Sequence, residues 1–194
     1  MPIEFASFAF IITLAAVVNG LGIVRWLTAL AEYLRHSNTL NLRHYWIFGL
    51  LAPFQFLLHI LMWWSLWGVR GAEEINFLMY VYVLAGPVLL YLGTSVLVPS
   101  IDEDMVDLKT HYFTVRPTYS SVLSLLWLWA IFMSPVLRGT FAPTMPVFAL
   151  FLVFSLTQRT TTKPKIQGLV AILNWLLLIV FVAVYAMQLG GTYG

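Results

Sequence analysis

Residues 14–36 read LAAVVNGLGIVRWLTALAEYLRH, an apolar run long enough to cross a bilayer that carries polar residues at regular intervals. Five of its residues recur every three or four positions, so a helix places them on one face: Asn19, Gly22, Arg25, Ala29 and Glu32. A cation inside a hydrophobic span is energetically unfavourable unless it finds a partner. We therefore expect the rest of the chain to form a helical bundle that gives Arg25 a polar surrounding.

The composition agrees with this interpretation. The chain has 194 residues, of which 61% are hydrophobic and 9% charged, and its mean hydropathy is +0.88. A soluble domain carries about 25% charged residues. After several spans of about 20 residues each, only short loops remain. The sequence thus predicts an all-α, polytopic transmembrane bundle with one integral membrane domain over residues 1–194.

Other properties narrow the function. The absence of cysteine excludes disulfides, thiolate nucleophiles and sulfur-ligated metals. A formal charge of +2 gives no indication of nucleic-acid binding. No phosphate-binding loop, catalytic triad or histidine pair at helical spacing is present, so no cofactor is expected. The expected partners are membrane lipids, together with either further copies of the chain or another membrane protein.

Six apolar segments are predicted to span the membrane, over residues 6–33, 46–67, 76–98, 117–137, 141–157 and 167–189. The fifth contains Pro143 and Pro146 and is barely long enough to cross about 30 Å of hydrocarbon. The third contains Ala85-Gly86-Pro87, which predicts either a kinked helix or a locally opened one that could line a site.

Basic residues predict the orientation. In a six-span arrangement seven of them fall on one side and two on the other. The seven are Arg35, Arg43, Lys109, Arg116, Arg159, Lys163 and Lys165, and the two are Arg70 and Arg138. The basic side is expected to be cytoplasmic, which places both termini on the non-cytoplasmic side. A re-entrant fifth segment would move the basic loop near residue 160 to the other side, so six spans are favoured. The expected location is a bacterial inner membrane.

Two loops on the basic side resemble each other. Residues 42–46 read LRHYW and precede the second apolar segment, and residues 108–113 read LKTHYF and precede the fourth. The similarity indicates either an internal repeat of helical hairpins or ordinary interfacial anchoring by aromatic and basic side chains.

The second span carries two polar residues deep in the bilayer. Gln55 and His59 lie one turn apart, on the same predicted face as Ala52 and Met62. A neutral histidine can donate and accept hydrogen bonds, and it can carry a proton near neutral pH. These properties suit a proton relay or an ion-sensitive gate. Interhelical hydrogen bonding, worth about 0.6 kcal/mol and at most about 2 kcal/mol, is the alternative. For Arg25 the alternatives are a fixed charge for an anionic substrate or lipid headgroup, and a side chain that extends to the interface.

The densest charge lies on the basic side. Asp102, Asp104, Asp107 and His111 supply ligands that a divalent cation could use, although their spacing does not match the EF-hand. A solvated helix start, with Asp102 as its N-cap, is the simpler interpretation.

These observations predict a non-enzymatic transporter or channel, and a pore between subunits of a homo-oligomer suits a chain of this size. Its polar path between the first two spans would use Asn19, Arg25, Glu32, Gln55 and His59. One alternative is a non-conducting accessory, sensor or assembly subunit of a membrane complex. Another is a membrane enzyme that acts at the cytoplasmic face through His111 and Asp104.

Overall fold

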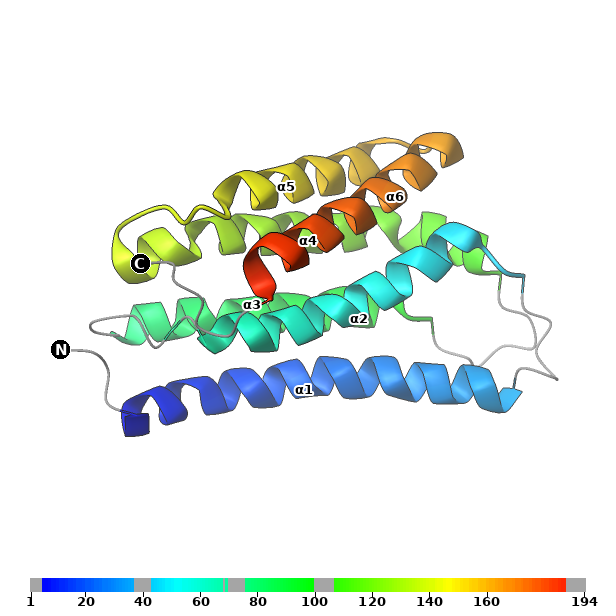
Figure 1. Cartoon of the computed structure of the whole chain (residues 1–194). Helices are drawn as coiled ribbons and strands as arrows, with labels where there is room; N and C mark the ends of the chain where they lie inside the picture. Colours follow the sequence, from blue (N-terminus) through cyan, green and yellow to red (C-terminus); the bar gives the residue numbers. More distant parts are fainter. Residues whose placement is uncertain (1–4, 37–42, 68, 70–75, 100–106, 188–194) are drawn as a thin grey trace.

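The computed structural model describes residues 5–36, 43–67, 69, 76–99 and 107–187. In these ranges the chain forms six α-helices and no strand, and the sixth helix continues into a short π-helix (Figure 1). The helices are α1 Phe5–His36, α2 Trp46–Leu66, α3 Phe77–Leu97, α4 Leu108–Arg138, α5 Met145–Thr160 and α6 Pro164–Phe181, followed by η2 Val182–Ala186.

Five of the described helices are long and apolar enough to cross a membrane. The exception is α5, whose 16 residues extend about 24 Å at 1.5 Å per residue. Outward-facing apolar residues such as Phe77, Leu78 and Val184 are more than half exposed, as expected for a surface that meets lipid. The protein is therefore multi-helical and suited to a membrane, whereas its orientation and the complete crossing of α5 stay predictions.

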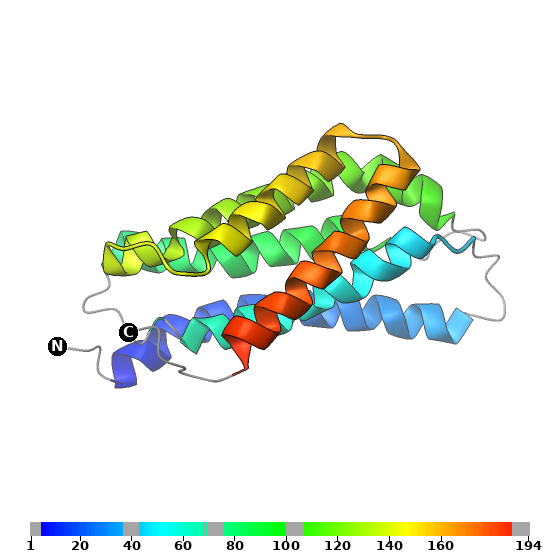
Figure 2. The ribbon, with the colours of Figure 1, turned by 45° about the horizontal axis from the view of Figure 1, so that its top comes forward.

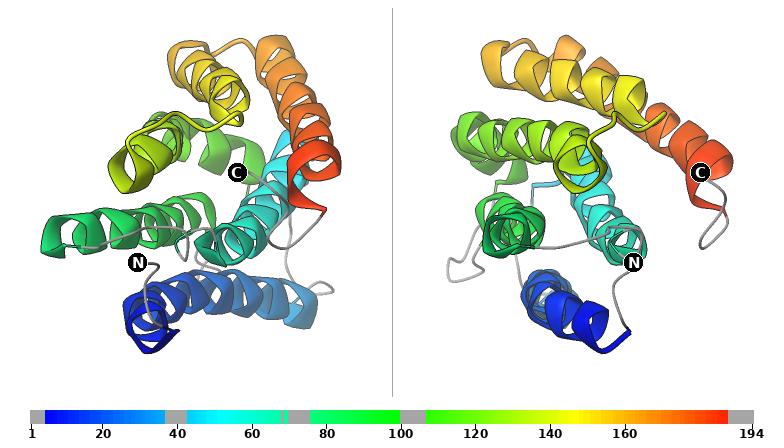
Figure 3. Two further views of the ribbon diagram at one scale, coloured as in Figure 1. Left: turned by 60° about the vertical axis from the view of Figure 1, so that its left-hand side comes forward. Right: turned by 90° about the vertical axis from the view of Figure 1, so that its left-hand side faces the viewer.

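The helices pack in layers. Figures 1 and 3 show α1 along one side of the bundle, α2 and α3 beside it, α4 next, and α5 with α6 on the opposite side. In Figure 2, α6 runs obliquely across the bundle, and it contacts both α5 and α2. Two indole N–H groups hold α2 between α1 and α6: Trp26 donates to Ala52 O at 2.8 Å and Trp175 to Leu50 O at 2.9 Å.

The hydrophobic pattern predicted most helix boundaries closely, but α4 begins at Leu108 instead of 117. Its first turns carry Lys109 and Arg116, so they lack the continuous apolar run by which spans are recognised. The N-cap that starts this helix is Asp107, whereas the proposed cap Asp102 lies outside the described residues.

The third helix is continuous through Pro87. Gly86 lies against the indole of Trp129, and a Cβ atom there would clash with the ring. Trp129 Nε1 donates to Tyr82 O at 2.7 Å, while the Tyr82 hydroxyl donates to Trp129 O at 2.8 Å. This reciprocal pair joins α3 to α4, so the Ala85-Gly86-Pro87 segment serves close packing within an unbroken helix.

Two contacts fix α4 and α5 as an antiparallel pair. The hydroxyl oxygens of Ser124 and Ser155 are 2.9 Å apart, and the rings of Trp127 and Phe151 stack with centroids 4.4 Å apart. The sums of these residue numbers are nearly equal, as an antiparallel register requires. The same register sets Gln158 opposite Ser120, one turn nearer the end at which α4 begins.

Candidate functional site

Five buried polar side chains from α1 to α4 form a single hydrogen-bonded cluster, called here the polar network. Its members are Asn19, Gln55, His59, Thr94 and Tyr119, each at most 1% exposed. They come from four different helices, so the network links that part of the bundle through polar contacts. Buried polar groups of this kind are stabilising only when each finds a partner.

His59 of α2 is held from two sides. Its Nδ1 atom lies 2.8 Å from Asn19 Oδ1, and its Nε2 atom lies 2.8 Å from Thr94 Oγ1. Asn19 Nδ2 also donates to the backbone oxygen of His59 at 3.0 Å. The imidazole is thereby fixed between α1 and α3.

Gln55 extends the network to α4. Its Nε2 atom donates to Leu90 O at 3.1 Å and to Thr94 Oγ1 at 3.3 Å. Its Oε1 atom accepts from the Tyr119 hydroxyl at 3.1 Å. Thr94 is thus shared between Gln55 and His59, and a continuous series of contacts runs from Asn19 to Tyr119.

Two glycines provide the space for these side chains. A Cβ atom at Gly22 would overlap the His59 imidazole, and one at Gly93 would lie 3.1 Å from Gln55 Nε2. Small residues allow membrane helices to approach closely, and here they also admit polar side chains between the backbones.

The structure brings together some of the residues that the sequence predicted to line a path. Asn19, Gln55 and His59 meet in the polar network, whereas Arg25 and Glu32 lie further along α1 and are only half-buried. Within the described ranges Arg25 has no hydrogen-bond or ion-pair partner. Sequence reasoning did not single out Tyr119 or Thr94.

The candidate metal ligands have other contacts. Asp107 Oδ1 accepts from the backbone N–H groups of Lys109 at 2.9 Å and Thr110 at 3.3 Å, and the Thr110 backbone N–H is the main cause that lowers the pKa of Asp107. His111 Nε2 donates to Leu97 O at 2.9 Å. Asp102 and Asp104 lie outside the described residues, and in the remainder no group of three or more potential metal ligands comes together.

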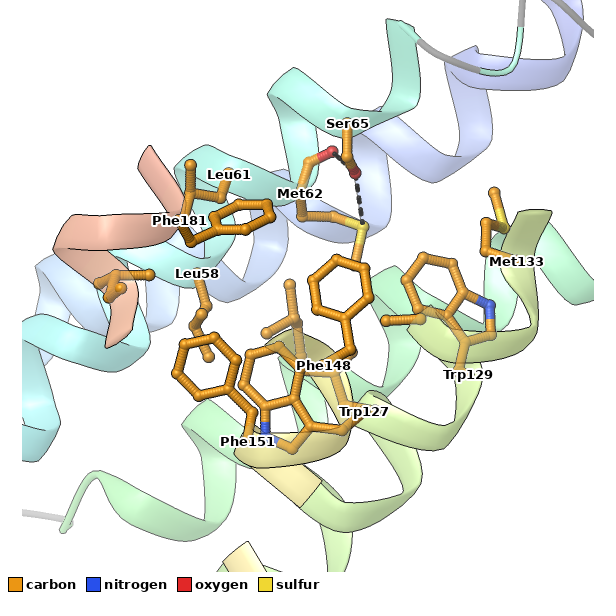
Figure 4. A pocket seen from close by; sticks show the side chains of 14 residues that line it. Leu58, Leu61, Met62, Ser65, Trp127, Trp129, Met133, Phe148, Phe151 and Phe181 are labelled. Atoms are coloured by element: carbon orange, nitrogen blue, oxygen red, sulfur yellow. Dashed lines mark hydrogen bonds between the residues drawn. The ribbon is translucent and has the colours of Figure 1, made fainter. Parts of the chain in front are cut away.

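Sequence reasoning also missed a cavity of about 140 Å³, called here the aromatic cavity. Residues of α2 to α6 line it, and five of them are aromatic: Trp127, Trp129, Phe148, Phe151 and Phe181. Figure 4 shows these side chains gathered around the space. The single lining residue with a hydroxyl is Ser65, which donates to Met62 O at 2.9 Å.

Stacked rings form one wall of the aromatic cavity. Trp127 stacks on Phe151 with a centroid distance of 4.4 Å and lies 6.1 Å from Phe148. Phe148 is 5.5 Å from Phe181, the last residue of α6 before the π-helix η2. The polar network members do not line this space, although Leu58 and Met62, their neighbours on α2, do.

Comparison of the chain with protein-family models, curated proteins and solved structures gives no match. A function for this chain must therefore be argued from the geometry of the polar network and the aromatic cavity.

Proposed function

We propose that the protein binds an apolar membrane ligand, a hydrocarbon chain, in the aromatic cavity. The observation that carries this proposal is an apolar space of about 140 Å³ whose walls include fully buried core residues such as Leu90 and Phe151. The space therefore reaches the interior of the bundle and is more than a furrow on its lipid-facing surface.

The size of the cavity supports a ligand. Protein interiors are close-packed, and enclosed empty volume costs about 24 cal/mol per Å³, so filling the inner part of this partly open apolar space with a ligand is favourable. An apolar cavity of about 150 Å³ stays dry and takes a molecule the size of benzene. A stretch of several methylene or isoprene carbons is of that size, and the surrounding membrane supplies such chains.

The end of α6 supports the same conclusion. Phe181 lines the cavity, and the next residues form the π-helix Val182–Ala186. The π-helix is rare in proteins, and where it does occur it is often found at a functional site. Phe181 at the end of α6 therefore forms part of the cavity wall at the point where the helix geometry changes.

Fluorescence quenching tests the proposal directly, because Trp127 and Trp129 line the cavity. The purified, delipidated protein in detergent is titrated with a fatty acid brominated along its chain. Saturable quenching is expected, together with a higher Tm in the presence of the unbrominated acid. Ala130→Leu places extra carbon atoms in the cavity and is expected to weaken binding about tenfold or more. Ala31→Leu on the exposed face of α1 is the matched control. Equal binding by the two variants would refute the proposal.

Transport through the polar network is the second candidate function. The observation that favours it is the unbroken series of polar contacts from Asn19 to Tyr119. The experiment is proton and ion flux into liposomes that contain the parent, His59→Ala or Arg25→Gln at matched reconstitution, and Arg25→Gln is the comparison outside the polar network. Flux in the parent that His59→Ala abolishes, with the fold retained, would support transport through the network, and flux no greater than in empty liposomes would contradict it.

A further inference from the structure

Arg116 of α4 is the one cation buried in the described part of the chain, with only 6% of its surface exposed. Its Nε and Nη1 atoms are enclosed by protein and have no hydrogen-bond partner. An unpaired buried charge is strongly unfavourable, so buried guanidinium groups are normally paired and hydrogen-bonded. Arg116 therefore requires a partner that its described neighbours do not supply.

The immediate neighbours of Arg116 are aromatic. Its guanidinium carbon lies 5.9 Å from the centroid of the Phe113 ring, and the Tyr45 ring lies 6.1 Å from the same ring. The Tyr45 hydroxyl is also buried without a partner. Burial raises the pKa of that hydroxyl, which keeps it protonated and able to donate. A cation–π contact offsets part of the charge but leaves the guanidinium N–H groups unsatisfied.

Two further groups without partners lie one turn deeper. The Ser120 hydroxyl and both side-chain amide atoms of Gln158 are enclosed and make no hydrogen bond. Gln158 is 1% exposed, and the register of α4 and α5 sets it opposite Ser120. Orphaned groups are uncommon in protein interiors, and their concentration over two turns of α4 contrasts with the paired polar network.

Hydrogen bonds join the three helices that surround these groups. The Tyr112 hydroxyl donates to Gln167 Oε1 at 2.5 Å, and Gln167 Nε2 donates to Gln158 O at 2.8 Å. These bonds hold α4, α5 and α6 together around the orphaned groups. The unpaired atoms are therefore not a consequence of loose packing at the end of the bundle.

We propose that Arg116 is the centre of a binding site for a phosphate group, with Tyr45, Ser120 and Gln158 as further donors. Guanidinium, hydroxyl and amide N–H groups all donate, and the oxygens of an oxyanion accept from each of them. Lys109, Lys163 and Lys165 lie at the same end of the bundle and would attract an anion. The phosphate belongs either to a lipid headgroup or to a free phosphate ion.

Thermal unfolding distinguishes the two sources. The delipidated protein in a nonionic detergent is heated with inorganic phosphate, with chloride at equal ionic strength, with phosphatidic acid or with diacylglycerol. A ligand at 100 times its Kd is expected to raise the Tm by about 5 °C or more. A rise with inorganic phosphate over chloride identifies the free ion. A rise with phosphatidic acid over diacylglycerol, without an effect of inorganic phosphate, identifies the lipid.

Variants connect the effect to the site. Arg116→Met removes the charge while retaining apolar volume, and it is expected to abolish the Tm shift. Gln158→Leu is expected to reduce it, which provides a second variant if Arg116→Met does not fold. Arg159→Gln removes an exposed charge at the same end and is expected to retain the shift.

Three results would overturn the proposal. One is no shift with either phosphate source. Another is an equal shift in Arg116→Met and the parent. The third is a shift seen only after Asp102, Glu103 and Asp104 are neutralised together, because the partner of Arg116 would then be the chain's own carboxylates.

Discussion

At the scale of single residues, Gly20 and Gly22 of α1 have very different surroundings. A Cβ atom at Gly22 would overlap the imidazole of His59, whereas one at Gly20 would meet nothing within 4 Å. His59 cannot move aside without losing its contacts with Asn19 and Thr94. The two glycines therefore form a matched pair for testing how closely α1 approaches α2.

Gly22→Ala is expected to lower the free energy of unfolding by about 1–3 kcal/mol, because the added methyl group overpacks the polar network. Gly20→Ala is expected to be neutral or to stabilise by up to about 1 kcal/mol, because alanine favours the helix. Denaturant titration in detergent, followed by circular dichroism, measures both. Equal effects of the two substitutions would contradict the described packing of α1 on α2.

Thr94→Val removes the hydroxyl that His59 and Gln55 share while retaining the shape of the side chain. The expected loss is about 1–2 kcal/mol in the free energy of unfolding, since an imidazole nitrogen is left without a partner. Thr114→Val is the control, because that exposed hydroxyl only contacts Thr110 O of its own helix. A loss no larger than that of the control would mean that the polar network contributes little stability.

The residues of the site were only partly predictable. Asn19, Gln55 and His59 are conspicuous because polar side chains at helical spacing deep in an apolar run are rare. Tyr119 resembles an ordinary interfacial anchor, and its contact with Gln55 joins residues 64 positions apart in the chain. Arg116 resembles a basic residue outside a span, and no sequence pattern shows that the packing of α4 buries it.

At the scale of helices, α4 shows how one capping residue sets a helix start. Asp107 accepts from two backbone N–H groups, and its other oxygen accepts from the Thr110 hydroxyl at 3.1 Å. These contacts stabilise the charged form, chiefly through the Thr110 backbone N–H, and so lower the pKa of Asp107 below its ordinary value of 3.8. The stabilisation from this cap is therefore fully present at pH values above 3.8. It is lost as the pH falls through the lowered pKa that Asp107 has in the folded protein.

Amide hydrogen exchange tests whether the cap is lost at low pH. Protection of the Lys109 and Thr110 amides, corrected for the intrinsic exchange rate, is expected to decrease in the acidic range below 3.8. Asp107→Asn retains a capping oxygen but does not titrate, so its protection is expected to stay constant over the same range. The same pH dependence in both proteins would exclude the Asp107 carboxylate as the cause.

Helix positions were more predictable than helix ends. Apolar runs identified all six helices, because burial in lipid requires continuous hydrophobic sequence. An apolar run does not reveal helical turns that carry charged residues, which is why the first turns of α4 were missed. The aromatic cavity could not be predicted at all, since it depends on the oblique path of α6 relative to α4 and α5 (Figure 2).

At the scale of the whole molecule, six alternating helices require the loops at the two ends of α5 to lie on opposite sides of the membrane. The chain contains no cysteine, so single cysteines can be introduced without a background. Thr140 precedes α5 and Thr162 follows it, and both are exposed. In intact cells, Thr140→Cys is expected to react with an impermeant maleimide and Thr162→Cys to react only after the membrane is opened. Reaction of both in intact cells would show that α5 does not cross.

The contacts around His59 also dictate where the ring carries its hydrogen. Because the Asn19 amide nitrogen donates to the His59 backbone, its oxygen is the atom that faces Nδ1, and Nδ1 must therefore be the protonated nitrogen. Nε2 is left as the acceptor for the Thr94 hydroxyl. The bundle thus selects the tautomer that is the minor one for free histidine in water, and the ¹⁵N chemical shifts of a labelled imidazole would report directly whether α1, α2 and α3 are assembled.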